Sequence, residues 1–406
     1  MTSQASANTA LTTDRPAAWS GVFAMTLCVF ALIASEFMPV SLLTPIAGDL
    51  HVTQGMAGQG IAISGVFAVV TSLFISTLAG PMNRKTLLLV LTSVMGLSGA
   101  IVGLAPTYLV YMAGRALIGV VVGGFWSMSA ATAMRLVPHH QVPRALAIFN
   151  SGNALATVVA APLGAYLGSV IGWRGAFLCL VPLSLVALAW QWISLPSMSV
   201  PPPATSGGNA LGIFKLFRNP VVSLGMLAVG LFFMGQFTLF TYVRPFLESV
   251  TRVEVGRLSV ILLVIGVTGF VGTMLISIVL RRGFYQTLAV IPVLMAVTAL
   301  ALIFFGTQAA VVIVLLGFWG LIATAAPVGW WAWVPRTFPK DAEAGGGLMV
   351  AVIQLSIALG STLGGLLFDG SGFRSTFAAS AVLLLVSAVV VWLTARRQAK
   401  QSTDTG

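Results

Sequence analysis

Twelve long apolar segments constrain the fold of this chain more than any other feature of its sequence. A helix needs about 20 mainly apolar residues to cross the hydrocarbon core of a bilayer. The segments lie at approximately 18–44, 57–79, 86–104, 108–134, 144–170, 175–195, 221–247, 256–280, 286–305, 309–335, 346–368 and 374–395. Charged residues make up only 7% of the chain, whereas a soluble domain has roughly 25%. The sequence therefore predicts an all-α polytopic membrane protein with 12 transmembrane helices.

The basic residues predict the orientation of these helices. Cytoplasmic loops of membrane proteins carry an excess of Lys and Arg. With the N-terminus inside, fourteen basic residues fall on the cytoplasmic side: Arg15, Arg84, Lys85, Arg135, Arg144, Lys215, Arg218, Arg281, Arg282, Arg336, Lys340, Arg396, Arg397 and Lys400. Four fall outside: Arg174, Arg252, Arg257 and Arg374. We therefore expect both termini to be cytoplasmic, and this asymmetry accounts for the net charge of +11 without a nucleic-acid partner.

One long polar stretch divides the twelve segments into two sets of six. It reads "PSMSVPPPATSGGNALGIFKLFRNP" (196–220), and its content of Pro, Ser and Gly is typical of a flexible linker. The predicted parts are an N-terminal cytoplasmic tail (1–17), an N-terminal six-helix bundle (18–195), a cytoplasmic linker (196–220), a C-terminal six-helix bundle (221–395) and a C-terminal cytoplasmic tail (396–406).

The two sets of six segments are repeats of each other. At an offset of 200 residues, "LGAYLGSVIGWRGAF" (163–177) aligns without a gap with "LGGLLFDGSGFRSTF" (363–377). The same offset aligns "SEFMPVSLLTP" (35–45) with "GQFTLFTYVRP" (235–245). Parallel repeats of six spans are typical of transporters that bind their substrate at mid-membrane, between the halves. We therefore expect two pseudo-symmetric six-helix bundles around a central site.

The distribution of chemically active residues argues against other classes of membrane protein. Both cysteines lie inside apolar segments and the three histidines fall in loops, so no metal site is expected. A primary pump would need a phosphate-binding Gly-x-x-x-x-Gly-Lys-Ser/Thr loop, and the sequence has none. An enzyme would need a cluster of nucleophilic or acid–base residues inside the membrane, which the sequence also does not offer. A secondary transporter is the class that these observations favour; composition does not exclude a channel, of which an uncoupled uniporter is the better version.

Glu36 is the residue that this class of function singles out. It is the one acidic residue well inside a predicted span, where a charged side chain costs about 2.5–3.5 kcal/mol on insertion scales. Burial favours the neutral acid, so the group is suited to take up and release a proton. The matching position of the second half holds Gln236, a neutral isostere. Glu36 is therefore the predicted proton carrier; hydrogen bonding to substrate without coupling, and a packing role, are the alternatives.

Arg115 is the predicted partner of Glu36. Glu36 lies roughly 13 Å below the outer end of its span near Pro45, at a rise of 1.5 Å per residue. Arg115 lies roughly 12 Å below the same surface, counted from Thr107. The matching depth suggests that Arg115 pairs with the Glu36 carboxylate in one conformation and releases it in another. A purely structural role for Arg115 is the alternative.

The chain resembles the major facilitator superfamily over nearly all of its length. "GRALIGVVVGG" (114–124) resembles the Arg-x-x-x-Gly-x-x-x-Gly pattern of the fourth span in that family, and "GNALATVVAAPLGAYLG" (152–168) resembles the antiporter motif of the fifth. The fit has two departures: Ala161-Pro162 stands where the family has Gly-Pro, and Gly80 stands where the loop after the second span has Asp. "EFMPVSLLTPIAGDL" (36–50) resembles the drug/proton antiporter-type exporters of sugars and nucleosides.

Four further stretches resemble the purine ribonucleoside efflux pumps of bacteria within that family. They are "GGFWSMSAATAMRLVP" (123–138), "GQFTLFTYVRP" (235–245), "PVGWWAWVPR" (327–336) and "VAVIQLS" (350–356). The resemblance implies export of purine ribonucleosides in exchange for H⁺, by a monomer in the bacterial inner membrane that contacts lipid and uses the proton gradient instead of a cofactor. Export of sugars of the arabinose type or of hydrophobic drugs, proton symport and uniport are the alternatives.

Under this resemblance the residues that would serve transport fall into two sets. Aromatic rings that can stack on a flat heterocycle and amides that can hydrogen-bond to it are the substrate candidates: Phe37, Trp126, Asn150, Asn153, Gln236, Phe240, Tyr242, Trp330 and Gln354. The gating candidates come from the basic pair after the second span and from the antiporter motif: Arg84, Lys85, Gly152, Pro162 and Gly164. Packing between helices is the alternative role for each set.

Overall fold

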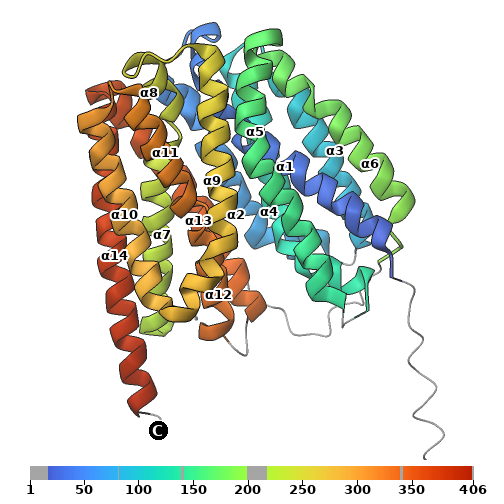
Figure 1. Cartoon of the computed structure of the whole chain (residues 1–406). Helices are drawn as coiled ribbons and strands as arrows, with labels where there is room; N and C mark the ends of the chain where they lie inside the picture. The colour runs from blue at the N-terminus through green and yellow to red at the C-terminus, as the bar shows by residue number, and fades with distance from the viewer. Residues whose placement is uncertain (1–16, 81, 139–140, 199–216, 339–341, 405–406) are drawn as a thin grey trace, which may run out of the picture.

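The computed structural model describes residues 17–80, 82–138, 141–198, 217–338 and 342–404, and these residues form helices and short loops without a strand. The N-terminal half contains α1 (Trp19–Asp49), α2 (Gln54–Ala79), α3 (Arg84–Gly103), α4 (Tyr108–Leu136), α5 (Val142–Leu178) and α6 (Leu180–Ser194). The C-terminal half contains α7 (Pro220–Phe240), α8 (Val243–Ser249), α9 (Val255–Arg282), α10 (Phe284–Phe305), α11 (Ala309–Ala323), α12 (Ala326–Thr337), α13 (Ala342–Ser371) and α14 (Phe373–Asp404). Figure 1 shows the two halves side by side.

Polar side chains at the loops set where several of these helices begin. Asn83 accepts a hydrogen bond from the backbone N–H of Lys85 at the start of α3. Thr107 does the same for Val110 at the start of α4, and Asn219 for Val221 at the start of α7. Such caps satisfy N–H groups that have no partner inside the helix. The helices therefore begin close to the predicted ends of the apolar segments.

The helices account for the twelve predicted spans. Eleven continuous apolar stretches in the described part of the chain are long enough to cross a membrane. One of them, Arg144–Ser194, has 51 residues and would be about 77 Å long if straight, against a hydrocarbon core of about 30 Å. Its backbone reverses at Gly172, where φ is 75°. It is therefore two spans, and the prediction of a twelve-helix membrane protein is confirmed.

Two spans are divided into shorter helices. α7 and α8 together make the seventh span, Pro220–Ser249. α11 and α12 make the tenth, Ala309–Thr337, which was predicted as one segment and is broken after Ala323. At the C-terminus, α14 continues to Asp404 and so includes most of the predicted tail. Most of the predicted linker, residues 199–216, lies outside the described residues.

The backbone confirms the internal repeat. Gly172 and Gly372 both have a left-handed φ, 75° and 77°, at the same offset of 200 residues that relates the two sequences. His51 and Arg252 are likewise left-handed, with φ of 54° and 57°, after the first and the seventh span. Left-handed φ is uncommon outside glycine, so its recurrence at two matched pairs of turns is not explained by composition. The two halves turn in the same places because they are copies of one unit.

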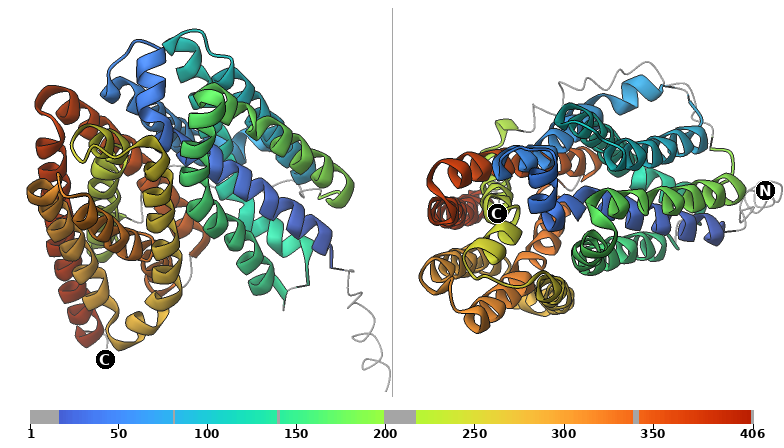
Figure 2. Two further views of the ribbon diagram at one scale, coloured as in Figure 1. Left: turned by 45° about the horizontal axis from the view of Figure 1, so that its top comes forward. Right: turned by 90° about the horizontal axis from the view of Figure 1, so that it is seen from above.

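The halves meet along two equivalent interfaces. α2 packs against α13, and α5 packs against α9. In the repeat α2 corresponds to α9 and α5 to α13, so a pseudo-two-fold axis between the halves exchanges the two interfaces (Figure 2). Each half has its own buried core, whereas large apolar side chains such as Leu109, Ile193 and Phe304 point outward. The outward apolar surface is the one that lipid would cover.

The start of α1 and the end of α14 lie at one end of the bundle, as six spans in each half require (Figure 1). We call the opposite end, with the loops 50–53, 104–107, 250–254 and 306–308, the far end. The ribbons of the two halves lie close together at the far end and diverge toward the end where α1 starts (Figures 1 and 2). The relation of the halves at mid-membrane therefore depends on the residues near their axis.

Candidate functional site

Two repeat-related phenylalanines mark the centre of the molecule. Phe37 on α1 and Phe237 on α7 occupy matching positions of the two halves, and their rings stack with centroids 5.8 Å apart and planes 28° apart. Residues that a two-fold axis exchanges can touch each other only at that axis. Phe240 packs edge-on against Phe237 at 6.1 Å. The chain around residue 37 therefore lies between the halves, where the repeat predicted a central site.

Glu36 lies next to this aromatic cluster and bonds across the two halves. Its side chain is 4% exposed, and none of the other acidic side chains that the structure describes is buried to this degree. The Nε2 group of Gln354, on α13, donates a hydrogen bond to Glu36 Oε1 at 3.1 Å. The Oε1 atom of Gln354 is buried and has no hydrogen-bond partner. The predicted proton carrier and one predicted substrate residue are thus in direct contact across the interface.

Arg115 donates hydrogen bonds to the backbone of α1 and α2. Its side chain is fully buried and donates from Nη1 to the carbonyl of Ser35 at 2.7 Å and from Nη2 to the carbonyl of Glu36 at 3.0 Å. Its Nε donates to the carbonyl of Gly60 at 3.0 Å, and Nη2 also lies 3.5 Å from the hydroxyl of Ser64. No ion pair within 4.0 Å joins the guanidinium to the Glu36 carboxylate in this conformation. The pairing of the two charges in another conformation stays a prediction.

Two prolines explain why α1 offers carbonyls to arginine side chains. Proline has no N–H, so a proline inside a helix leaves the carbonyl four residues earlier without its helical partner. Pro39 therefore frees the carbonyl of Ser35, and Pro45 frees that of Ser41. Arg115, from the same half, donates a hydrogen bond to the carbonyl of Ser35. Arg244, on α8 of the other half, donates a hydrogen bond to the carbonyl of Ser41.

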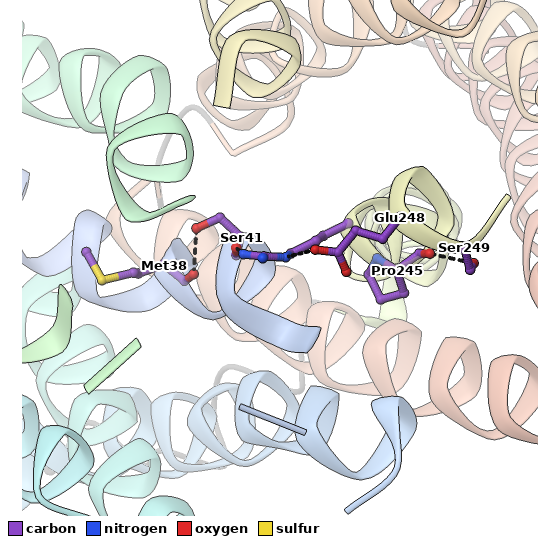
Figure 3. A network of polar contacts seen from close by, with 6 residues as sticks. Met38, Ser41, Pro245, Glu248 and Ser249 are labelled. Atoms are coloured by element: carbon purple, nitrogen blue, oxygen red, sulfur yellow. Dashed lines mark hydrogen bonds and ion pairs between the residues drawn. The ribbon is translucent and has the colours of Figure 1, made fainter. Parts of the chain in front are cut away.

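The Arg244 contact is part of a network at the far end of α1 (Figure 3). The Nε of Arg244 forms an ion pair with Glu248 at 2.8 Å, one turn along α8. The hydroxyl of Ser41 donates to the carbonyl of Met38 at 2.9 Å. Arg244 is 6% exposed, so its bond to the Ser41 carbonyl is made almost out of reach of water. A buried charge-assisted bond of this kind holds α8 against α1.

A second contact joins the halves at the far end. Asp369, near the end of α13, accepts a hydrogen bond from the Thr53 hydroxyl at 2.6 Å and one from the backbone N–H of Gly55 at 2.9 Å. The Thr53 hydroxyl accepts in turn from the N–H of Met56 at 3.1 Å, as a helix cap does. A carboxylate is also favourable at the positive end of a helix. Asp369 therefore caps α2 from the opposite half.

The predicted substrate residues have different surroundings. Gln236 is half-buried, with an Oε1 atom that has no partner, and Phe240 is half-buried beside Phe237. Trp126 is half-buried and packs edge-on against Phe125 at 5.9 Å. Asn153 is half-buried, and Asn150 is exposed and bonds within α5. In the described structure no hydrogen bond or ring contact joins these last three residues to Glu36.

Two predicted aromatic residues are built into the protein interior. Tyr242 is fully buried; its hydroxyl donates to the carbonyl of Ser361 at 2.8 Å and its ring stacks on Phe368 at 5.3 Å. Trp330 is 2% exposed and packs against Trp333. Neither ring is brought to the centre in this conformation, because both have protein on all sides.

The predicted gating residues lie at close contacts of helices. A methyl group at Gly152 would lie 2.5 Å from the carbonyl oxygen of Thr26, and one at Gly164 would lie 2.6 Å from the hydroxyl of Ser41, so α5 runs very close to α1. Pro162 frees the carbonyl of Val158. Gly266 of the other half packs against this carbonyl, since a methyl group there would lie 2.6 Å from its oxygen. Arg84 and Lys85 begin α3, where their N–H groups bond Met198 and Asn83.

The sequence reasoning missed the carbonyls of Ser35 and Ser41 and the role of Arg244. The signal was available, since prolines stand four residues after each serine and Arg244 is one of two arginines not assigned to a loop. It also missed a second glutamine contact between the halves, in which the Thr362 hydroxyl donates to Gln59 Oε1 at 3.0 Å. No pattern in the sequence indicates that pair.

The comparisons with known proteins agree with this architecture. Residues 25–346 match the family model of the Major Facilitator Superfamily. The chain is 68% identical over 386 residues to the transcription regulatory protein OpdE of Pseudomonas aeruginosa, covering 95% of this chain and 96% of that one. It is 39% identical over 373 residues to the purine ribonucleoside efflux pump NepI of Salmonella enteritidis, covering 92% and 93%.

A solved structure confirms the fold independently of these sequence matches. The human organic anion transporter MFSD10 (TETRAN) superposes with a TM-score of 0.64 at 17% identity, over 93% of this chain and all of that one. The twelve spans, the internal repeat and the family match point to a transporter and away from an enzyme. The chain belongs to the Major Facilitator Superfamily.

Proposed function

We propose that this protein exports a small neutral solute, best a purine ribonucleoside of the inosine or guanosine type, in exchange for H⁺. The observation that carries the proposal is the position of Glu36. It is a buried carboxyl group at the axis of a two-fold repeat, bonded to the opposite half through Gln354. A group that can gain or lose a charge at this place changes how the halves interact. The 39% identity to an efflux pump for purine ribonucleosides supports both the direction and the substrate.

In the proposed cycle the site between the two halves opens alternately to the two sides of the membrane. With both termini in the cytoplasm, as the basic residues predict, the far end faces the outside of the bacterial inner membrane. Glu36 takes up H⁺ from the outside and releases it to the cytoplasm, where the solute then binds. The second half has Gln236 at the matching position, which can hydrogen-bond but cannot carry a proton. One proton carrier per chain fits a monomer that needs the proton gradient and no cofactor.

The residues around Glu36 fit a flat solute with hydroxyl groups. Phe37, Phe237 and Phe240 offer ring faces on which a base can stack. Gln236 and Gln354 each have a buried amide oxygen without a partner, and such an atom gains from a ligand N–H or O–H. Trp126, Asn150 and Asn153 extend the proposed set along α4 and α5. A cationic drug is a poorer candidate because the buried Arg115 offsets the charge of Glu36.

The close contacts of α5 are the proposed moving parts. Gly152 and Gly164 let α5 lie directly against α1, and Pro162 weakens α5 beside the contact with Gly266 of the other half. A helix that contacts its neighbour through glycines has no large side chains at that contact to resist sliding or tilting. Arg84 and Lys85 would steady the cytoplasmic ends of the helices through phosphate groups of lipid or through loop contacts.

The test is transport in vesicles with an imposed pH gradient, using labelled inosine, guanosine, arabinose and a cationic dye. A difference of one pH unit lets one proton support about a tenfold solute gradient. We expect the wild-type protein to accumulate the nucleosides against their gradient and the Glu36→Gln variant to bring them only to equal concentrations. Gln236→Leu is the matched control; it removes a proposed solute contact in the other half, so it should slow transport but keep the dependence on the pH gradient. Full uphill transport by Glu36→Gln would refute the proposal.

A second candidate function is control of transcription, which the name of the 68% identical relative suggests. An exporter can act on transcription indirectly when it lowers the cytoplasmic concentration of a solute that a separate regulator binds. This version makes the regulatory effect a result of transport. Transcript levels in cells that express wild type or Glu36→Gln distinguish the two: an effect that survives in the transport-deficient variant would belong to a separate activity.

A further inference from the structure

The side-chain amide of Gln354 has a hydrogen-bond partner at its nitrogen atom and none at its oxygen atom. Its Nε2 group donates to Glu36 Oε1 at 3.1 Å, whereas its Oε1 atom is buried and has no partner. Gln354 is 6% exposed and Glu36 is 4% exposed, so water has little access to either side chain. A buried oxygen atom without a donor is unfavourable. When no solute is bound, the donor that would satisfy it has to come from a neighbouring side chain.

The carboxyl group of Glu36 can supply this donor when it is protonated. A carboxylic acid has one O–H to donate, whereas a carboxylate only accepts. An acid and a primary amide that face each other form two hydrogen bonds in a ring, N–H to the acid carbonyl and O–H to the amide oxygen. With the acid ionised, only the N–H bond remains, and the carboxylate repels the amide oxygen. Protonation of Glu36 therefore adds a bond between the halves and removes a repulsion.

We propose that Gln354 is a positioning residue that couples the protonation state of Glu36 to the contact between the halves. Two hydrogen bonds hold α1 to α13 when Glu36 is protonated, and one holds them when it is ionised. This inference rests on the proposed function of Glu36 and states how its proton acts on the conformation. The contact has no covalent chemistry. The proton moves onto Glu36 Oε2 from one side of the membrane and leaves it to the other.

The charged groups around Glu36 and Gln354 do not take part in the proposed switch. Arg115 is the charged group close to it, and it bonds the Glu36 backbone carbonyl. α2, α6 and α7 carry no charged residue. The other described charged groups on helices packed against α1 and α13 lie toward helix ends or loops: Asp49, Arg84, Lys85, Arg135, Arg144, Arg174, Arg244, Glu248, Arg336, Asp369, Arg374, Arg396, Arg397 and Lys400. The buried titratable hydroxyls of Tyr111 and Tyr242 bond the carbonyls of Ala57 and Ser361, and the Cys28 thiol lies beside Thr92.

The direction of this switch agrees with exchange of solute for H⁺. The Glu36–Gln354 bond exists here together with the far-end contacts of Asp369 and Arg244. Protonation strengthens the bond and so favours the conformation that is closed at the far end. A proton taken up from the outside thus closes the outside, and its release to the cytoplasm loosens the halves for reopening. Symport would need solute and proton to close the far end together.

The test measures the distance between the halves as a function of pH. Spin labels are attached through Gly48→Cys and Thr307→Cys, two exposed far-end positions of opposite halves, after Cys28→Ala and Cys179→Ser. In lipid, the ratio of short to long distances should rise about tenfold from about pH 8.5 to about pH 5.5, the effect of one gained hydrogen bond. In Gln354→Leu it should change less than about twofold. Glu36→Gln should stay closed at both pH values, because an amide there both donates and accepts.

Gln59→Leu is the matched control. Gln59 also bonds across the halves, to Thr362, but its partner does not titrate. The variant should lower the closed population equally at both pH values and keep the tenfold response. Gln354→Met replaces Gln354→Leu if the latter does not fold, as judged by size-exclusion chromatography.

A tenfold pH response in Gln354→Leu, with none in Glu36→Gln, would overturn the role of Gln354 and leave the proton carrier in place. A pH response and uphill export that both survive in Glu36→Gln would remove the proposed function as well. The two failures are therefore distinguishable in the same set of variants.

Discussion

The carbonyls of Ser35 and Ser41 on α1 are freed in the same way and used differently. Each precedes a proline by four residues, and each accepts a hydrogen bond from a buried arginine. Arg115 reaches Ser35 from α4 of the same half, whereas Arg244 reaches Ser41 from α8 of the opposite half. The first bond can persist while the halves move as units. The second has to break whenever the far end opens.

The comparison shows how one local device yields either rigidity or a releasable contact. Arg115 has four acceptors on α1 and α2, so it fixes three helices of one bundle to each other. Arg244 has one acceptor in the opposite half, and Glu248 in its own half keeps the guanidinium paired. An arginine whose charge stays paired after release pays a smaller penalty for separation. The sequence context of the carbonyl is the same; the position of the arginine decides its role.

The largest effect should come from Arg115→Lys. A lysine keeps the charge but has a single ammonium group that cannot reach the carbonyls of Ser35, Glu36 and Gly60 together. The loss of buried charge-assisted bonds should lower stability by about 2–4 kcal/mol. Thermal unfolding in detergent measures this loss, with Arg244→Lys as the matched control. An unchanged midpoint would show that Arg115 does not brace the bundle.

The predicted pairing of Arg115 with the Glu36 carboxylate is tested by the same variant. If Arg115 acts only as a brace, the folded fraction of Arg115→Lys should keep the wild-type pH profile of transport. A shifted profile at normal protein level would mean that the guanidinium also acts on the carboxylate in another conformation. The two roles are therefore separated by comparing stability with pH dependence.

An intermediate effect is expected for Arg244→Gln. The variant removes the bond to Ser41 from the far end, and each half keeps its own core, so the unfolding midpoint should hardly change. The closed population at the far end should fall about tenfold, as for the loss of one bond to a charged group. The Gly48 and Thr307 spin labels report this ratio. Because Arg244→Gln leaves Glu248 unpaired, the double variant with Glu248→Gln is the control.

The smallest effects should come from the prolines themselves. Alanine at position 39 or 45 restores an N–H that competes with the arginine for the freed carbonyl. Pro39→Ala should lower stability by less than about 1 kcal/mol, and Pro45→Ala should lower the closed population by about twofold to threefold. Unfolding and spin-label distances measure the two. An equal response of both variants in both measurements would mean that the carbonyls have no separate roles.

The fold followed from the sequence because the bilayer leaves a chain few choices. Apolar length gave the twelve spans, and the matches at one offset gave the repeat, which the left-handed turns at Gly172 and Gly372 confirm. The break in the tenth span was missed because its hydropathy continues across the two short helices. Hydropathy measures the preference for lipid and is insensitive to a local change of backbone direction.

The site was predicted in part, and the missing part is geometric. A charged residue is easy to recognise within an apolar segment, so Glu36 and Arg115 could be identified from the sequence. A rise of 1.5 Å per residue placed them at the same depth. Depth does not give the rotation of a helix about its axis, so the sequence could not tell that Arg115 faces carbonyls. For the same reason it could not separate Phe37, at the centre, from Tyr242 and Trp330, which are enclosed in protein.

The cap that Asp369 places on α2 ties the start of that helix to the state of the transporter. While the far end is closed, the N–H of Gly55 has a carboxylate partner from the other half. When the halves part, this amide is left to solvent, and the first turn of α2 is free to fray. Amide hydrogen exchange at Gly55 and Met56 therefore reports how often the far end opens, without any label on the protein.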